Sequence, residues 1–367
     1  MKILIHSGRV KPFFSKREQL LRMLIAAKHD VTVGGYEANC EKECNEFGVE
    51  YVQVPMSRAG LNPFEDIKTL WAYYRLFKAQ KYDVVHSYTA KPNIYGSIAA
   101  RLAGIKRIYP VVNGLGYAFI GNDAKTRIVR LAISVLYKLS FACADKVIFQ
   151  NKDDADELVK RRIIRKDKCI VVAGSGVDLD AYPYSPLESQ NCFLMATRLL
   201  RTKGVIQYCE AARMLKRKYP LARFMLAGDY DKNPDGVKVE EIQPYIADGS
   251  VEYLGLVSDM VSALKTCSVF VLPSFYREGV PHANLEAMSI GRAIITTDMP
   301  GCKETLNGKN GLMVEAESTE SLIKAMRWML DNPIEVEKMG NESRKYAEER
   351  FDVNIVNTQM IKTMQIR

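Results

Sequence analysis

The sequence predicts an α/β protein built from two Rossmann-like, doubly wound domains that face each other across a cleft. Short β-branched runs alternate with longer amphipathic stretches, as in parallel sheets that are covered by helices. The plan of the first half is repeated in the second half. A length of 367 residues is too large for one hydrophobic core and suits two domains. The cleft is then the expected ligand site.

The first half begins with the apolar run KILIHSG, which we expect to form a buried strand. Gly104 is a typical residue just past a helix end, and Asp123 is a typical N-cap. In chain order, the expected strands cover residues 2–8, 30–36, 47–55, 82–88, 107–116, 145–151 and 168–178. The expected helices cover residues 12–29, 63–80, 93–104 and 123–144.

The second half follows the same alternation after a joint at residues 174–191, which is rich in Gly, Ser, Pro and Asp. Strands are expected at the start of 191–204 and over 222–229, 251–257, 268–274, 292–298 and 311–317. Helices are expected over 205–220, 259–267 and 281–290, and again near the end. We therefore assign domains to residues 1–175 and 188–345, with 346–367 as a C-terminal helix that is able to pack back on the first domain.

Composition narrows the class of protein. Apolar residues make up 47% and charged residues 26%, which is ordinary for a globular chain. No apolar run approaches the length of about 18 residues that a spanning helix needs, and the N-terminal run is too short for a signal peptide. Eight cysteines without a C-x-x-C, and only four histidines, argue against zinc and favour reduced thiols in the cytoplasm.

The net charge of +9 comes from the first half, which holds 29 basic and 19 acidic residues in 1–187 against 23 and 24 in 188–367. A solvated basic surface would explain this, and so would a partner such as an anionic membrane, a diphosphate or nucleic acid. Nucleic acid ranks last because no motif for it is present. Residues 11–23 and 125–141 mix basic with apolar or aromatic side chains, which favours a membrane surface even if the helices also bury one face.

The stretch YREGVPHANLEAMSIGRAIIT, residues 276–296, places two glutamates around a Gly–Val–Pro turn. Gly279 allows a ligand to approach the backbone, and Pro281 suits the first turn of a helix. Free amides at such a helix start bind anions. Glu286 would accept hydrogen bonds from a vicinal diol such as ribose, and Glu278 would meet a second polar group. Acids that merely complement the helix dipole would explain one glutamate but not both.

The same stretch resembles the E-x7-E signature of retaining glycosyltransferases of family 4, which have the GT-B fold. The resemblance implies that ATRLLRTKGV supplies Arg198 and Lys203 to the donor diphosphate, so that Glu278, Arg198 and Lys203 are the expected catalytic residues. The expected substrate-binding residues are Glu286, Gly279, Val280, His282, Asn284, Leu285, Gly8, His86, Lys91, Asn113 and Val257. Of these, His86 follows the strand YDVV and is expected at a carboxyl end that faces the cleft.

The segments SRAGLNPFEDI, VVNGLGYAF and LYKLSFACADKVIFQN resemble enzymes of capsule, O-antigen and N-glycan assembly. This resemblance implies an undecaprenyl-diphosphate-linked acceptor and a peripheral location at the cytoplasmic face of the inner membrane. It also favours a UDP-linked N-acetylhexosamine or hexose as the nucleotide-sugar donor. Two positions depart from the usual pattern, because Gly8 stands where many members have a Gly-Gly pair, and Asn113 stands where many have a histidine or an acid.

The resemblance implies a front-face substitution in which the leaving phosphate oxygen takes the acceptor's proton. We expect no obligatory metal and no cofactor, and the D-x-D triplets at 178–180 and 229–231 are interpreted as turns. Two alternatives stay open. A GT-B-type sugar-nucleotide epimerase should carry more histidines and acids around one cleft. A non-catalytic nucleotide-binding subunit should have lost some of the residues Glu278, Glu286, Arg198 and Lys203.

Overall fold

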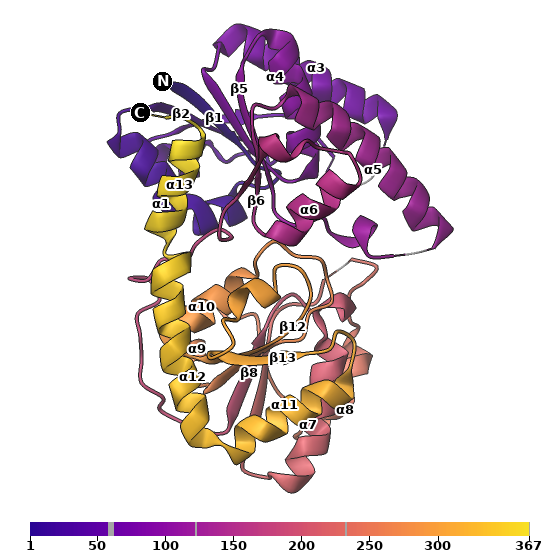
Figure 1. Ribbon diagram of the computed structural model, residues 1–367, viewed down its shortest axis with the longest axis vertical. Helices are drawn as coiled ribbons and strands as arrows, with labels where there is room; N and C mark the ends of the chain where they lie inside the picture. The colour runs from indigo at the N-terminus through magenta and orange to yellow at the C-terminus, as the bar shows by residue number, and fades with distance from the viewer. Residues whose placement is uncertain (58–61, 122, 232, 367) are drawn as a thin grey trace. The chain divides into compact units, whose positions relative to one another are not determined.

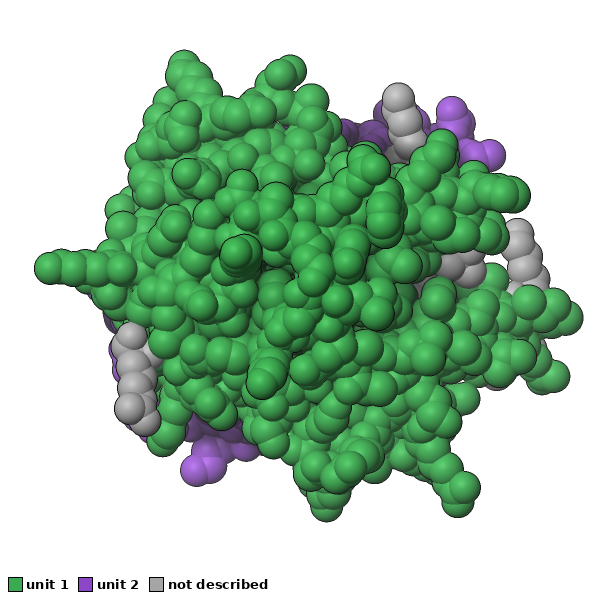
Figure 2. Space-filling model, turned by 90° about the horizontal axis from the view of Figure 1, so that it is seen from above, with its two compact units in different colours: residues 1–175, 354–367 green, residues 176–353 purple. Residues whose placement is uncertain are grey.

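The computed structural model describes residues 1–57, 62–121, 123–231 and 233–366. The chain divides into two compact units, which Figure 2 colours separately. Unit 1 comprises residues 1–175 and 354–367, and unit 2 comprises residues 176–353. Each unit contains a parallel sheet with helices on both of its faces (Figure 1), so the predicted α/β class is confirmed.

Unit 1 has a seven-stranded sheet in the order β3-β2-β1-β4-β5-β6-β7. The strands are β1 (Lys2–His6), β2 (Asp30–Gly35), β3 (Glu50–Gln53), β4 (Val84–Tyr88), β5 (Arg107–Val112), β6 (Val147–Phe149) and β7 (Cys169–Val171). The chain first builds outward from β1 through β2 and β3, and then continues on the other side of β1 with β4. The strand order therefore reverses between β1 and β4, which is where open α/β sheets bind ligands.

Helices cover both faces of this sheet. They are α1 (Lys11–Ala26), α2 (Glu41–Glu46), α3 (Pro63–Gln80), α4 (Ser97–Ala103), α5 (Ala124–Cys143), α6 (Lys152–Lys160) and α13 (Val353–Thr363). One core joins side chains of α3 to α6, including Tyr73 and Phe141, to one face of the sheet. The other core joins α1, α2 and α13, so Met360 near the C-terminus packs with Leu20.

Unit 2 repeats the topology with six strands in the order β10-β9-β8-β11-β12-β13. They are β8 (Cys192–Ala196), β9 (Arg223–Ala227), β10 (Glu252–Gly255), β11 (Val269–Leu272), β12 (Ala293–Thr297) and β13 (Gly311–Val314). The helices are α7 (Val205–Lys218), α8 (Val239–Ala247), α9 (Met260–Lys265), α10 (His282–Ile290), α11 (Thr319–Asp331) and α12 (Pro333–Tyr346). Here the strand order reverses between β8 and β11.

Three helices were absent from the expected elements, and each has a local reason. α2 is one and a half turns of EKECNE that buries only Cys44, and α6 is largely charged, so neither shows a strong apolar period. α8 contains Pro244, which normally argues against a helix interior. Within the described ranges, no helix is both long and apolar enough to cross a membrane.

Candidate active site

Two loops meet at the point in unit 2 where the strand order reverses. One follows β8 and the other follows β11. The carbonyl oxygen of Thr202 accepts the backbone N–H of Phe275 at 2.8 Å and that of Tyr276 at 3.0 Å, so the loops are tied together. Gly204 keeps them close, because it has φ +79° and an added Cβ would lie 2.4 Å from the carbonyl oxygen of Pro273. Ligands of doubly wound sheets bind at this place.

An ion pair joins these two loops. The Nζ of Lys203 lies 2.6 Å from Oε2 of Glu278, and only 10% and 15% of the two side chains is exposed. The Lys203 ammonium also lies 5.6 Å from the ring centroid of Tyr276. The structure thus brings together two of the three residues expected to be catalytic. A compact positive charge at the carboxyl ends of the central strands is suited to an anionic ligand.

Arg198, the third of these residues, lies in the same loop but has a different partner. Its guanidinium is 3.2 Å from Asp231 in the loop after β9, and 57% of its side chain is exposed. Ion pairs at this exposure contribute only about 0–1 kcal/mol. Asp231 therefore holds Arg198 weakly, and the guanidinium is able to exchange this partner for a ligand.

The D-x-D triplet at 178–180 begins a turn, as predicted, whereas in the triplet at 229–231 only Asp231 does so and Tyr230 lies in an isolated β-bridge with Leu199. Oδ1 of Asp178 accepts the backbone N–H of Asp180 and of Ala181, both at 3.0 Å. Oδ1 of Asp231 accepts the backbone N–H of Asn233 at 2.9 Å. These side chains therefore shape the local backbone in the way that Asp does in turns.

The N-terminus of α10 lies directly after the loop that carries Glu278. Pro281 is the N-cap with an extended backbone, not a residue of the first turn as expected, and the first intrahelical bond runs from Asn284 N to Pro281 O at 3.1 Å. Gly301 packs closely against the loop that precedes α10. Its φ is +81°, and an added Cβ would lie 1.5 Å from the carbonyl oxygen of Gly279, so only glycine fits there. The backbone at Gly279 and Val280 is therefore fixed just before a helix start, where anions bind.

Glu286 lies on α10, one turn after His282. Its Oε1 is 2.9 Å from Nδ1 of His282 and accepts a hydrogen bond of 2.8 Å from the Tyr182 hydroxyl. Burial, and then the charge of Glu286, raise the pKa of Tyr182, so this hydroxyl stays a donor. Arg344 donates to the backbone oxygen of Tyr182 at 3.2 Å and helps to fix it.

Sequence reasoning missed Tyr182. It lies in the joint that was interpreted only as a linker, 104 positions before Glu286. The joint at residues 174–191 was noted for its Gly, Ser, Pro and Asp residues, and no local pattern indicates which distant carboxylate a tyrosine will reach. Tyr276 was likewise recognised as part of the stretch but not as a neighbour of Lys203.

Three other residues were expected to contact the nucleotide sugar, namely Asn284, Leu285 and Val257, and they differ in how far they are exposed. Asn284 and Leu285 are fully buried, and the Nδ2 of Asn284 donates to Oγ1 of Thr305 at 2.9 Å. Both residues therefore pack in the core, and their backbone N–H groups donate to the carbonyl oxygen of Pro281, so the structure does not expose either of them to a ligand. Val257 is half-buried, two residues beyond β10, where the carbonyl oxygen of Gly255 accepts the backbone N–H of Gly228 at 2.8 Å.

In unit 1, Gly8 and Lys91 lie at the reversal between β1 and β4. An added Cβ on Gly8 would be 3.3 Å from Oγ1 of Thr89, which itself has φ +71°. A positive φ is unusual for a β-branched residue and marks local strain. The Nζ of Lys91 lies 2.8 Å from Oδ1 of Asp66. Asn113 is exposed, one residue past β5.

The expectation for His86 is wrong. The strand continues to Tyr88, so His86 lies inside it and is fully buried, not at a carboxyl end. Its Nδ1 is 2.9 Å from the carbonyl oxygen of Tyr109 and its Nε2 is 2.8 Å from the Tyr88 hydroxyl. Burial lowers the pKa of His86 to about 3. It is a neutral core histidine with both ring nitrogens in use.

The two segments expected to face a membrane differ in their apolar side chains. On α1, Phe13 and Phe14 are 5% and 7% exposed and belong to the core, so the aromatic part of that expectation is wrong, while Lys16 is exposed. On α5, a stripe at helical spacing is more than half exposed. Its members are Ile128, Leu131, Val135 and Leu139. The side chains of Lys11 and Lys125 and residues 58–61 lie outside the described part of the chain.

Comparison with known proteins gives two family matches. Residues 17–174 match the glycosyl transferase 4-like domain, and residues 183–346 match the glycosyl transferases group 1. A relative from Campylobacter jejuni, N,N'-diacetylbacillosaminyl-diphospho-undecaprenol alpha-1,3-N-acetylgalactosaminyltransferase, is 31% identical over 377 residues, which cover 98% of this chain and 96% of that protein. An Escherichia coli relative, UDP-Gal:alpha-D-GlcNAc-diphosphoundecaprenol alpha-1,3-galactosyltransferase, is 28% identical and covers 77% and 75%.

Solved structures share the fold. WaaG, a glycosyltransferase involved in lipopolysaccharide biosynthesis, superimposes with a TM-score of 0.77 at 15% identity and full coverage of both chains. Anabaena HepE in complex with UDP and glucose superimposes with a TM-score of 0.79 at 17% identity, covering 100% of this chain and 99% of that one.

Proposed function

Since the chain belongs to the glycosyl transferases of group 1 with a glycosyl transferase 4-like N-terminal half, we propose that it is a retaining enzyme acting on a lipid-linked acceptor. The donor is a UDP-linked N-acetylhexosamine or hexose, and the acceptor is an undecaprenyl-diphosphate-linked saccharide in surface glycan assembly. The names of the two relatives support this proposal, because both describe alpha-1,3 transfer to a diphosphoundecaprenol-linked sugar.

The observation that carries the proposal is the Lys203–Glu278 pair at the strand reversal of unit 2. It combines a fixed positive charge with the N-terminus of α10 only a few residues away in the chain. These are two independent features that attract a diphosphate. Arg198, held weakly by Asp231, adds a second charge from the same loop.

In the proposed reaction, the bond from the anomeric carbon to the diphosphate oxygen breaks and a bond to the acceptor oxygen forms on the same face. The proton of the acceptor hydroxyl passes to the departing phosphate oxygen. Lys203, Arg198 and the amides near Gly279 and Val280 stabilise the negative charge that develops on the leaving group. Because protein cations supply this charge, the proposal requires no metal. The carboxylate of Glu286, oriented by Tyr182 and His282, accepts hydrogen bonds from the ribose hydroxyls.

Unit 1 is proposed to bring the enzyme to the cytoplasmic face of an anionic membrane as a peripheral protein. The basic excess of residues 1–187 and the exposed stripe on α5 support this. Arg127 and Lys138 are also exposed on α5. Basic charges near a membrane surface contribute about 1 kcal/mol each.

The test is a donor screen with purified protein, undecaprenyl-diphosphate sugars and a panel of UDP-, GDP- and dTDP-sugars in EDTA. We expect one donor to release its nucleotide, and we expect Lys203→Ala and Glu286→Ala each to lower kcat/KM by about 100-fold or more. Arg201→Ala is the matched control, because Arg201 lies in the same turn but pairs with Glu241 at the surface.

Two outcomes would overturn the proposal. If nucleotide release is unchanged by Lys203→Ala and by Glu286→Ala, the reaction takes place at another site. Nucleotide binding without release of nucleotide from any donor would favour the non-catalytic nucleotide-binding subunit over the enzyme.

A further inference from the structure

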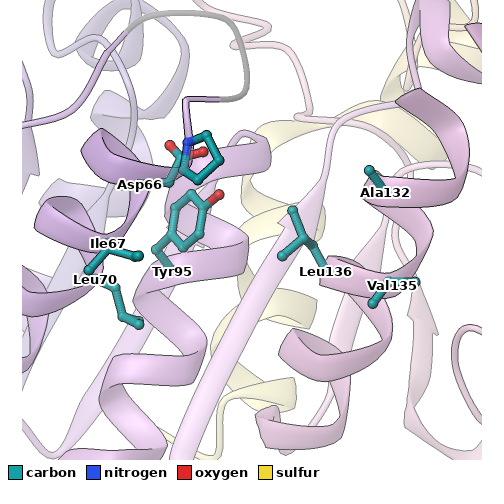
Figure 3. A pocket seen from close by; sticks show the side chains of 8 residues that line it. Asp66, Ile67, Leu70, Tyr95, Ala132, Val135 and Leu136 are labelled. Atoms are coloured by element: carbon teal, nitrogen blue, oxygen red, sulfur yellow. The ribbon is translucent and has the colours of Figure 1, made fainter. Parts of the chain in front are cut away.

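A hollow of about 510 Å³ lies between α3 and α5 in unit 1. Figure 3 shows Ile67 and Leu70 on one side and Ala132, Val135 and Leu136 on the other. The walls are thus almost entirely aliphatic. Both helices pack against η1 (Pro92–Gly96), whose Tyr95 also lines the hollow.

Exposed apolar stripes flank the hollow on both helices. On α3, the exposed fractions are 79% for Phe64, 63% for Ile67 and 53% for Trp71, at a spacing of three and four residues. On α5, Ile128 and Leu131 are 70% and 68% exposed. Two such stripes form a larger exposed apolar surface than single scattered residues do, and surfaces of this size mark interaction sites.

One end of the hollow is polar. Asp66 and Tyr95 lie there together in Figure 3. Asp66 is ion-paired with Lys91, whose Nζ also donates to the Ser57 hydroxyl at 2.6 Å. Lys91 follows β4, at the strand reversal of unit 1. The polar end of the hollow is therefore formed by the Asp66 carboxylate and Tyr95, and the partly buried cation paired with Asp66 stands where doubly wound sheets bind ligands.

We propose that this hollow holds the first isoprene units of the acceptor's polyprenyl chain, with Lys91 facing the diphosphate. The inference rests on the proposed function. The exposed stripes alone would suit a flat bilayer surface, whereas the hollow between them is concave and mostly apolar, as ligand sites are. The aliphatic walls match a long hydrocarbon, and the diphosphate attached to it would take the place of the Asp66 carboxylate on Lys91.

The experiment uses a polyprenyl diphosphate with a diazirine in its first isoprene units, in detergent micelles with the full chain. We expect crosslinks to peptides of α3 and α5, competed by undecaprenyl diphosphate but not by phosphatidylglycerol. Crosslinks elsewhere, or equal competition by both lipids, would overturn the proposal. Crosslinking does not need transfer, so it remains decisive if the proposed reaction fails.

A kinetic variant gives a second measurement. Ala132→Phe fills the hollow, and we expect KM for an undecaprenyl-diphosphate sugar to rise about tenfold, which corresponds to about 1.4 kcal/mol. KM for an acceptor with a short alkyl chain, and the affinity for UDP, should stay unchanged. The matched control is Ala79→Phe at an exposed position of α3 outside the hollow. Two results would contradict the placement of the polyprenyl chain in the hollow. One is that Ala132→Phe raises KM equally for the undecaprenyl acceptor and the short-alkyl acceptor. The other is that Ala79→Phe raises KM as much as Ala132→Phe does.

Discussion

The two units share one topology and differ in what they place around it. Both sheets reverse their strand order next to their first strand. In unit 2 the loops at the reversal are tied through Thr202 and carry the Lys203–Glu278 pair. In unit 1 the corresponding loops carry Gly8 and Lys91, and the cation is paired with a carboxylate on α3. Topology thus determines where a ligand binds, and the loops determine which ligand it is.

The two units also differ in which side chains they bury and which they expose. In unit 2 the Lys203–Glu278 pair at the site is mostly buried, while in unit 1 the large apolar side chains exposed on α3 and α5 form stripes at helical spacing. Unit 2 is therefore suited to a small charged ligand, and unit 1 to a ligand or surface with a hydrocarbon part. Three predictions test this division, beginning with the largest effect.

The first concerns the close packing of the loops in unit 2. Gly301→Ala would place a methyl group against the carbonyl of Gly279 at a positive φ, and we expect a loss of about 3–5 kcal/mol in unfolding free energy. UDP affinity should fall as well, because the backbone before α10 must move. Urea unfolding and calorimetric titration with UDP measure the two effects.

Gly308→Ala is the matched control for this prediction. Gly308 has a similar φ of +84°, but nothing lies within 4 Å of an added Cβ. It should therefore cost only about 1 kcal/mol, the price of the backbone conformation alone. If both substitutions cost the same, the contact with Gly279 is unimportant, and the tied loops do not distinguish unit 2.

The sequence predicted the parts of this molecule that depend on local pattern. The GT-B fold is confirmed, and each expected strand overlaps an observed one, although several were drawn too long at the carboxyl end, such as 107–116 against β5 and 168–178 against β7. The E-x7-E stretch indicated Glu278. Family resemblance indicated Arg198 and Lys203, which lie in a loop 75 or more positions earlier in the chain. What failed was the end of one strand. β4 continues to Tyr88 and all five of its residues are buried, so His86 lies in the core and not at a carboxyl end.

The second prediction uses that buried histidine. Burial lowers the pKa of His6 and of His86 to about 3, against 6.5 for a free side chain. Below pH 6.5 the unfolded chain binds protons that the folded unit cannot, so stability falls as pH falls. Each histidine contributes about 1.4 kcal/mol of loss per pH unit in this range. Unit 1 should therefore lose about 2–3 kcal/mol between pH 7.5 and 5.5.

The chain's two tryptophans separate the units in this measurement, since Trp71 lies in unit 1 and Trp328 in unit 2. Urea unfolding of Trp328→Phe reports on unit 1 by fluorescence, and that of Trp71→Phe reports on unit 2. His86→Gln added to the first variant should remove about half of the pH dependence. Equal acid sensitivity of the two signals would show that buried histidines do not set the difference.

The smallest expected effect concerns the outer surface of α5. Leu131 is 68% exposed, and its transfer into a bilayer interface would remove apolar area from water, so Leu131→Ser should weaken binding to phosphatidylglycerol vesicles about five- to tenfold. Leu221→Ser is the control in unit 2, because Leu221 is 94% exposed and its substitution should not change vesicle binding.

Vesicle sedimentation at rising NaCl adds a second criterion, because salt screens the contribution of Arg127 and Lys138 but leaves that of Leu131. If both leucines matter equally, the membrane contact is not confined to unit 1. If salt alone abolishes binding in both variants, charge rather than the apolar stripe holds the enzyme at the surface.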